Sequence, residues 1–274
     1  MASGVGHPLV DTHCHLDFQL FDEDRTQVVD RARKAGVKYI LNPGIDLASS
    51  QAAVTLAEEY AEVYAAVGVH PHSASTFNQN TLPRLRELAS HPKVVAIGEI
   101  GLDYYRDQAP PEIQQRIFRL HLDLAAELGL PVVIHNRQAT ADVLNMLTEW
   151  QAQLVDDGSA LAERPGVLHS YSDDEANGLK AIAINFYIGI TGPVTFRNAA
   201  ELQQVVASLP VEHLLIETDA PFLTPHPMRG QRNEPALVRR VAEKVAELHS
   251  GPVDEIARIT SENAGRLFNW RVMA

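Results

Sequence analysis

The sequence predicts an α/β fold in which eight parallel strands and their intervening helices form a (β/α)8 TIM barrel. Short apolar, β-branched runs alternate at regular spacing with longer amphipathic segments along the 274 residues. Strands joined through helices pair in parallel by right-handed crossovers. An open doubly wound sheet fits this alternation too. The barrel is favoured because no Gly-x-Gly-x-x-Gly run follows the first strand and polar residues stand at many strand ends.

Each strand is predicted from an apolar run too short for a helix. The expected strands are, in order, 8–11, 37–41, 63–69, 94–97, 131–134, 166–168, 186–190 and 213–216. Helical spacing of apolar residues predicts helices over 25–35, 49–60, 111–128, 139–154 and 199–208. Gly36 and Gly129 punctuate helix ends, and Asp24 and Asn198 stand where N-caps belong. The run 252–269 predicts a C-terminal extra helix, so we expect a single domain over residues 1–274.

Composition narrows the class of protein. With 35 acidic and 23 basic residues the net charge is −12, which disfavours extended binding to duplex nucleic acid but allows a strand end to enter a locally positive pocket. The one cysteine excludes an internal disulfide and a cysteine-based zinc finger. No apolar run is long enough to span a bilayer, and the N-terminus lacks a secretory signal. We therefore expect a cytoplasmic protein with no membrane partner.

Histidines and carboxylates follow six of the eight expected strands. His13 and His15 are two residues apart on a strand and share one face, whereas Cys14 points to the other and is expected to be a small buried apolar residue. The other candidates are His70 and His72, Glu99 and Asp103, His135, His169, and Glu217 and Asp219. Imidazole with carboxylate suits zinc, manganese, nickel or iron, and the number of donors exceeds one tetrahedral site. The pattern therefore favours two metals bridged by a carboxylate.

Five segments of the chain resemble the TatD family of metal-dependent deoxyribonucleases, a branch of the amidohydrolase-like superfamily. They are Asp-Thr-His-Cys-His at 11–15, Gly-Glu-Ile-Gly-Leu-Asp-Tyr at 98–104, Pro-Val-Val-Ile-His at 131–135, Glu-Thr-Asp-Ala-Pro at 217–221 and Arg-Gly-Gln-Arg-Asn-Glu-Pro at 229–235. The resemblance extends over essentially the whole chain and implies a barrel of the metal-dependent hydrolase type. One departure bears on substrate preference: the segment after His169 reads Ser-Tyr-Ser-Asp, where the family has Cys-Phe-Ser-Gly.

The resemblance implies two divalent metal ions, with magnesium, manganese and zinc as the candidates. One ion is expected on His13, His15 and Asp219 and the other on His135 and His169, with Glu99 bridging the two. The implied reaction is hydrolysis of DNA phosphodiester bonds by a water that the two metals activate, in a 3′–5′ exonuclease mode on single strands or ends. Asp219 and Glu99 are the expected catalytic carboxylates, Asp219 as the proton acceptor. No obligate protein partner is inferred.

Other residues are expected to contact the substrate or support a ligand. By the resemblance His70 lies near the substrate. Guanidinium groups pair with phosphate and tyrosine stacks on bases, which adds Tyr104, Arg137, Arg229 and Arg232. Glu217 is expected to orient a ligand histidine. Two alternatives stay open: the same site acting on an amide, lactone or small phosphoester, and a barrel that binds metal without turnover.

Overall fold

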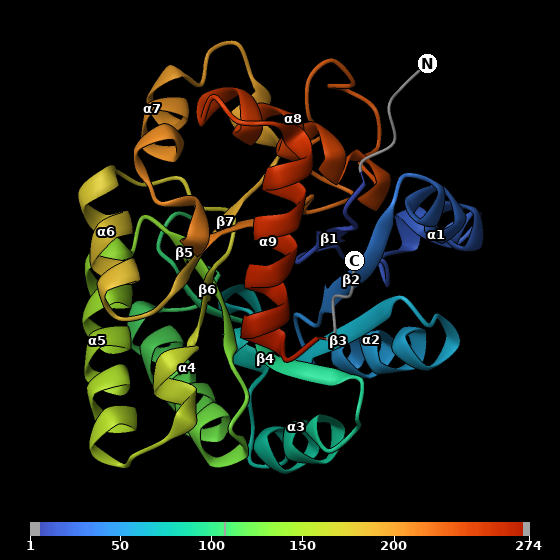
Figure 1. Cartoon of the computed structure of the whole chain (residues 1–274). Helices are drawn as coiled ribbons and strands as arrows, with labels where there is room; N and C mark the ends of the chain where they lie inside the picture. The colour runs from blue at the N-terminus through green and yellow to red at the C-terminus, as the bar shows by residue number, and fades with distance from the viewer. Residues whose placement is uncertain (1–5, 107, 271–274) are drawn as a thin grey trace. The chain divides into compact units, whose positions relative to one another are not determined.

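The computed structural model describes residues 6–106 and 108–270 (Figure 1). Within these ranges eight strands follow one another in chain order in one sheet, and helices alternate with them. The pairs β1–β2, β3–β4, β4–β5, β5–β6 and β7–β8 are parallel. The (β/α)8 fold class predicted from the sequence is confirmed. The strands are β1 Leu9–Asp11, β2 Val37–Pro43, β3 Val63–Val67, β4 Val94–Asp103, β5 Val132–Arg137, β6 Gly166–Leu168, β7 Tyr187–Ile190 and β8 Leu214–Ile216.

The helices include all of those expected from apolar spacing. They are α1 Arg25–Lys34, α2 Leu47–Glu59, α3 Thr81–Ala89, α4 Pro111–Leu128, α5 Thr140–Asp156, α6 Glu175–Ala183, α7 Ala200–Ser208, α8 Val238–Leu248 and α9 Val253–Phe268. Short 3-10 helices are η1 Gln19–Phe21, η2 Pro71–Thr76, η3 Ala160–Glu163, η4 Gly192–Thr195, η5 Val211–His213 and η6 Pro235–Leu237. The sequence analysis missed α3, α6 and α8. Pro83 and Gly178 weaken the pattern in α3 and α6, whereas the buried positions of α8 do follow helical spacing.

Local signals account for the ends of α4 but not for the start of α1. Pro111 occupies the first turn of α4, and Gly129 ends the helix in a left-handed conformation with φ 65°. Asp24 stands at the N-cap of α1, yet its side chain caps nothing and instead accepts hydrogen bonds from Arg31 and Arg232. The N-cap of α7 is Ala199, one residue beyond the predicted Asn198.

The chain packs as two compact units. The first unit contains the described residues up to Asn42, Ser170–Gly178 and the residues from Ile188 onward, and the second contains Pro43–His169 and Leu179–Tyr187. In the first unit α8 and α9 pack against each other and on β1 and β8 (Figure 1). In the second, α2 packs on β3, α4 on β4 and α5 on β5. The expectation of a single domain included terminal residues outside the described ranges and stays a prediction.

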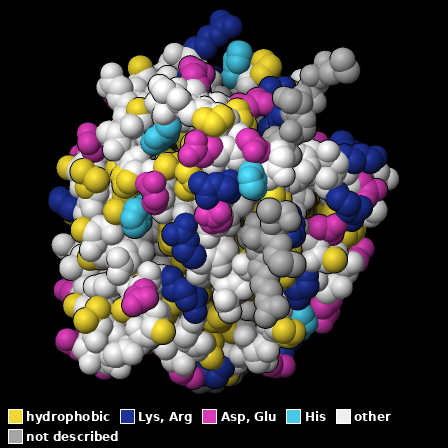
Figure 2. Space-filling model, viewed as in Figure 1, with side chains coloured by type: hydrophobic (Ala, Val, Ile, Leu, Met, Phe, Trp, Pro, Cys, Tyr) yellow, Lys and Arg dark blue, Asp and Glu magenta, His cyan; other side chains and the backbone are white. Residues whose placement is uncertain are grey.

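The described surface carries both signs of charge. Lys and Arg side chains are interspersed with Asp and Glu on the face shown in Figure 2, consistent with the mixed composition behind the net charge of −12. No described helix combines the length and apolar character needed to cross a membrane.

Candidate active-site clusters

In the first unit, His13, His15 and Asp219 form one cluster of potential metal ligands. The Nε2 atoms of the two histidines are 3.2 Å apart, and Oδ1 of Asp219 lies 3.9 Å from Nε2 of His13 and 3.6 Å from Nε2 of His15. The imidazoles are buried, while the Asp219 side chain keeps 17% of its surface exposed. Two imidazoles and one carboxylate at these separations fit a divalent transition metal. The structure thus brings together the three residues expected to share a metal, and ligation itself stays a prediction.

Asp11 holds this cluster together through the backbone. Its carboxylate accepts hydrogen bonds from the Thr218 N–H at 2.9 Å, the Thr218 hydroxyl at 2.5 Å and the His13 N–H at 3.3 Å. Burial raises the pKa of Asp11 to about 8, because it outweighs these hydrogen bonds. The Asp219 N–H donates to the His13 carbonyl at 2.8 Å, and Asp219 itself has φ 55°. Asp11 therefore ties the end of β1 to the segment that carries Asp219, a role the sequence analysis did not assign.

Two further first-unit residues behave as supports. Glu217 is buried and accepts from the Thr12 hydroxyl at 3.2 Å and the Ser170 N–H at 3.1 Å. A Cβ at Gly189 would collide with the Glu217 carboxylate, so glycine leaves room for it. Glu217 therefore positions Thr12 and Ser170, the sequence neighbours of His13 and His169, and orientation of a ligand histidine by it stays a prediction. Cys14 is fully buried, which confirms the predicted packing role.

In the second unit, Glu99 and His135 form the centre of another cluster. Oε1 of Glu99 lies 3.0 Å from Nδ1 of His135. Residue Gly101 on β4 pairs with His135 on β5, and Gly101 has φ 135° with its α-carbon so close to the His135 carbonyl that a Cβ would overlap it. Glycine at 101 thus permits the close approach of β4 and β5 that brings the carboxylate to the imidazole.

His70 joins this cluster as a hydrogen-bond donor. Its Nε2 lies 3.6 Å from Oε1 of Glu99, while its Nδ1 accepts the backbone N–H of His72 at 3.1 Å. Because Nδ1 is an acceptor, neutral His70 carries its proton on Nε2. Its distances alone would also allow metal ligation, but a proton on Nε2 fits donation better. This geometry agrees with the expected substrate contact, which no observation tests directly.

Asp103, which the sequence analysis left without a role, holds the far side of the His135 ring. Its Oδ2 lies 3.0 Å from Nε2 of His135 and 2.8 Å from Nε2 of His72. Burial tends to raise the pKa of Asp103, but hydrogen bonds from His135, the Arg106 N–H and His72 outweigh it and lower the pKa below the usual range. Burial likewise opposes charge on His135, yet its bonds to Asp103 and Glu99 raise the pKa of the imidazole.

The ionised Asp103 therefore fixes the tautomer of His135. It retains a proton on Nε2, so that Nδ1 is the nitrogen able to act as a ligand beside Glu99. His169 ends β6 in register with this site, because Leu168 pairs with Ile134 and the His169 N–H donates to the Ile134 carbonyl at 2.9 Å. The proposed sharing of a metal by His135 and His169, and the bridging role of Glu99, stay predictions.

Asp103→Asn is expected to weaken metal binding by about 10- to 100-fold, the usual cost of removing a carboxylate behind a ligand histidine. The amide retains the size of the side chain but can no longer hold the His135 proton as strongly. Titration of the metal-free protein with Mn²⁺ measures the change in affinity. If Asp103 serves only the fold, the variant will instead lose thermal stability without metal and keep wild-type affinity.

The three predicted phosphate-binding arginines differ in their surroundings. The guanidinium of Arg137 lies 4.2 Å over the ring of Tyr105, and that of Arg229 lies 4.0 Å over the ring of Phe196. Neither has a carboxylate partner among residues 6–106 and 108–270. Arg232 instead forms two hydrogen bonds with Asp24, at 2.7 and 2.8 Å, and one with the Leu20 carbonyl. Arg232 therefore already serves to join the η1 region to the segment before α8.

Tyr104 also has internal partners. Its hydroxyl donates to Asp142 at 2.7 Å and accepts from Gln115 at 2.7 Å. Burial and the nearby Asp142 raise its pKa above the usual value. The neighbouring Tyr105 is more open, with 54% of its surface exposed. Substrate contact by Tyr104 stays a prediction, and it would have to involve the ring rather than the occupied hydroxyl.

His121 on α4 supports the segment that carries His70. Its Nε2 accepts the Val69 N–H at 3.2 Å, and its Nδ1 lies 2.8 Å from the Ile117 carbonyl, to which it donates. The ring also meets Phe77 edge to face at 5.7 Å. Complete burial lowers the pKa of His121 to about 4, against 6.5 for an ordinary histidine. The neutral ring is therefore part of the folded structure.

This pKa predicts a stability loss in mild acid. Above pH 6.5 His121 is neutral in both states and contributes no pH dependence; between pH 6.5 and 4 only the unfolded chain takes up its proton. The free energy of unfolding then falls by up to about 1.4 kcal/mol per pH unit, or about 3 kcal/mol in all. Urea unfolding of metal-free wild type and His121→Gln at several pH values measures this. Equal slopes for the two proteins would contradict the assignment.

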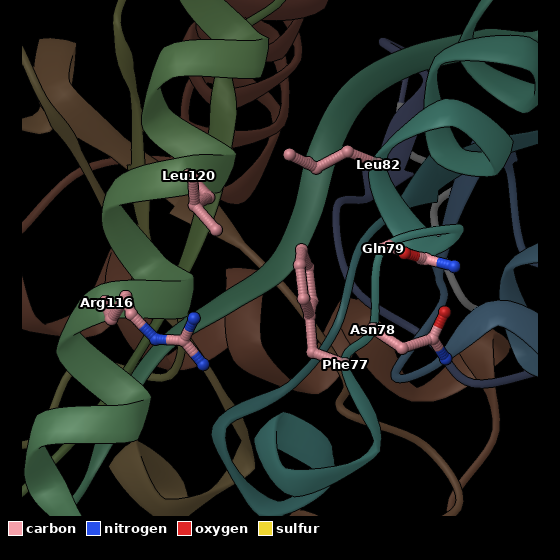
Figure 3. Close-up of a pocket in the computed structure, with 6 residues that line it drawn as sticks. All are labelled: Phe77, Asn78, Gln79, Leu82, Arg116 and Leu120. Atoms are coloured by element: carbon pink, nitrogen blue, oxygen red, sulfur yellow. The ribbon is translucent and has the colours of Figure 1, made fainter.

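A pocket in the second unit lies apart from these donors. It has a volume of about 300 Å³ and is lined by Phe77, Asn78, Gln79, Leu82, Arg116 and Leu120 (Figure 3). The Phe77 ring stands between the α3 side chain of Leu82 and the α4 side chains of Leu120 and Arg116. None of the expected metal ligands lines it, so the candidate chemistry belongs to the histidine–carboxylate clusters.

Comparison with known proteins identifies the family. A family model described as TatD related DNase matches residues 10–269. The chain is 45% identical over 260 residues to YabD of Bacillus subtilis (strain 168), named an uncharacterized metal-dependent hydrolase, covering 95% of this chain and 98% of that protein. It is 38% identical over 266 residues to TatD of Cronobacter turicensis, named a 3′-5′ ssDNA/RNA exonuclease, covering 95% and 97% of the two chains.

A solved structure agrees with the sequence matches. The crystal structure of YjjV, a TatD homologue from Escherichia coli K12, superposes with a TM-score of 0.88 at 34% identity and covers 96% of this chain and 98% of its own. The resemblance inferred from five short segments is thereby confirmed over nearly the full length. The chain belongs to the TatD related DNase family and is a metal-dependent hydrolase.

Proposed function

We propose that this protein hydrolyses phosphodiester bonds in single-stranded DNA or at DNA ends, from the 3′ end, with two divalent metal ions. Magnesium, manganese and zinc are the candidate metals. The relative named a 3′-5′ ssDNA/RNA exonuclease supports this direction and substrate. The donor sets fit metals of this kind: His13, His15 and Asp219 in one unit, and Glu99 with His135 in the other. Bound there, divalent ions lower the pKa of water and neutralise charge on phosphoryl oxygens.

The observation that favours a phosphodiester over an amide or lactone is the state of two arginines. Arg137 and Arg229 each lie over an aromatic ring and have no carboxylate partner within the described ranges, although the whole chain carries a net charge of −12. Stacking on an aromatic face fixes a guanidinium while leaving its N–H groups directed outward for an anion. Each unit thus holds one donor cluster and one arginine suited to phosphate.

The chain's own groups can divide the remaining work. Asp219 is the most exposed member of its cluster and is suited to accept the proton of the attacking water. His70, whose proton lies on Nε2, is suited to donate a hydrogen bond to a phosphate oxygen. Asp103 holds the His135 tautomer, and Asp11 holds Asp219 against β1. Together these groups position a phosphodiester and accept one proton during its cleavage.

The experiment that tests this function starts from protein stripped of metal by a chelator. Single-stranded DNA labelled at the 5′ end is incubated with the metal-free protein, and then with Mg²⁺, Mn²⁺ or Zn²⁺ restored. The expected result is no cleavage without metal and a ladder of products shortened stepwise from the 3′ end with metal. Failure to cleave DNA under every metal, with turnover of a lactone or small phosphotriester, would overturn the proposal. Metal analysis of the purified protein counts the ions.

A further inference from the structure

Phe222 is an exposed aromatic side chain three residues after Asp219, in the same unit. Its exposed fraction is 49%. Single exposed apolar side chains are normal on protein surfaces, so exposure alone means little. The backbone of Phe222, however, is held on both sides: its N–H donates to the Asp219 carbonyl at 2.9 Å, and its carbonyl accepts from the Asn233 side chain at 2.6 Å. An exposed ring on a fixed backbone needs a reason beyond packing.

The anchor of this backbone is itself buried. Asn233 is fully buried, and its side-chain amide also donates to the Thr218 carbonyl at 2.8 Å. One amide group thus spans Asp219, with Thr218 on one side and Phe222 on the other. The position of the Phe222 ring is therefore coupled to the position of the candidate ligand.

A row of rings links Phe222 to the first cluster. Phe18 stacks on His15 with ring centroids 4.7 Å apart and planes inclined by 20°. Phe222 meets Phe18 edge to face, with centroids 5.9 Å apart and an angle of 73°. Such pairs restrict the rotation of both side chains. The exposed ring at the end of the row is consequently held within two ring contacts of a candidate metal ligand.

We propose that Phe222 is the stacking platform for an unpaired nucleobase of the strand whose phosphodiester lies at the His13, His15 and Asp219 cluster. This inference rests on the proposed function and specifies its substrate class. A base in a duplex already stacks on its neighbours and pairs with its partner, whereas a base in a single strand or a frayed end has a free face. Every base has such a face, so an aromatic platform selects unpaired strands without selecting sequence.

The charge near Phe222 agrees with this occupant. Arg229 belongs to the same segment between β8 and α8, lies over Phe196, and has no carboxylate partner among the described residues. A base on Phe222 carries phosphates on both sides of its sugar, and an unneutralised guanidinium in this segment suits one of them. A purely apolar occupant, such as a protein side chain, would make no use of that cation.

The test crosses two enzymes with two substrates. Wild type and Phe222→Ala are assayed on a single-stranded oligonucleotide and on the same strand with a stable abasic residue at each of the first four positions in turn. On the normal strand, Phe222→Ala is expected to raise KM by about 5- to 100-fold with little change in kcat, because base stacking contributes that much to binding. At one abasic position the two enzymes should have equal KM values. Phe222→Trp should restore tight binding.

Leu179→Ala is the matched control, since Leu179 is another exposed apolar residue, 44% exposed on α6. It should bind both strands as wild type does. Equal losses by Phe222→Ala on normal and all abasic strands, or no loss on either, would overturn the platform while leaving the nuclease function in place. Failure of the proposed function has a different signature, because wild type would then cleave neither strand with any metal.

Discussion

Asp219→Asn is expected to lower kcat on single-stranded DNA by about 100- to 10,000-fold, the range that a general base contributes. The amide cannot accept a proton and is a poorer metal ligand than a carboxylate. The fold should survive, because asparagine has the same shape and tolerates the positive φ of 55° at this position as aspartate does. The backbone bonds of residue 219 to His13 and Phe222 are also retained. Turnover and thermal unfolding, measured side by side, check both halves of this expectation.

Asp254→Asn is a suitable control for this substitution. Asp254 lies at the start of α9, where its carboxylate accepts the His7 N–H, and it belongs to neither donor cluster. The control should keep wild-type turnover. If Asp219→Asn turns over DNA at the wild-type rate, Asp219 is not the proton acceptor, and the role must pass to another carboxylate.

Much of the first cluster was predictable because it follows from local rules. Alternation along a strand puts His13 and His15 on one face, and parallel strands end at the same edge, which brings Asp219 from the end of β8 to the end of β1. The observed separations of 3.2 to 3.9 Å agree with that reasoning. The tie through Asp11 was less visible, because its partner Thr218 is 207 residues away.

The second cluster shows where local rules fail. The expected strand ended at residue 97, but β4 runs to Asp103. Glu99 and the glycines beside it look like a strand end in the sequence, whereas Gly101 is needed inside β4 because the carbonyl of His135 passes too close for a side chain. The role of Asp103 depends on His135, 32 residues away, and no spacing rule connects the two. Long-range pairs of this kind need the fold.

The arginines make the same point. Arg137, Arg229 and Arg232 are chemically identical, and the sequence analysis assigned all three to phosphate. The structure gives Arg232 a carboxylate partner, Asp24, and leaves the other two over aromatic rings. What separates them is the neighbour that the fold supplies. Phe222 escaped notice for a related reason, since a phenylalanine near a motif is ordinarily a core residue and only its exposure distinguishes it.

Glu99→Gln is expected to reduce both metal affinity and turnover by more than Asp103→Asn does. Oε1 of Glu99 lies 3.0 Å from Nδ1 of His135 and 3.6 Å from Nε2 of His70, so its charge lies where the donor atoms converge. Asp103 acts from behind the ring, and loss of such a carboxylate costs about 10- to 100-fold. Loss of the inner carboxylate removes a donor and its charge, and should exceed that range. Mn²⁺ titration and kcat measured at saturating metal separate the two effects.

The order of these two variants distinguishes the inner carboxylate from the outer one. If Glu99 is a ligand, excess Mn²⁺ should restore most of the turnover of Asp103→Asn but little of that of Glu99→Gln, because only the former retains every donor. The reverse order would make Asp103 the ligand carboxylate, with Nε2 of His135 beside it. The geometry favours Glu99, because Asp103 also accepts from His72 and from the backbone N–H groups of Tyr105 and Arg106. A carboxylate already holding four hydrogen bonds has little capacity left for a metal.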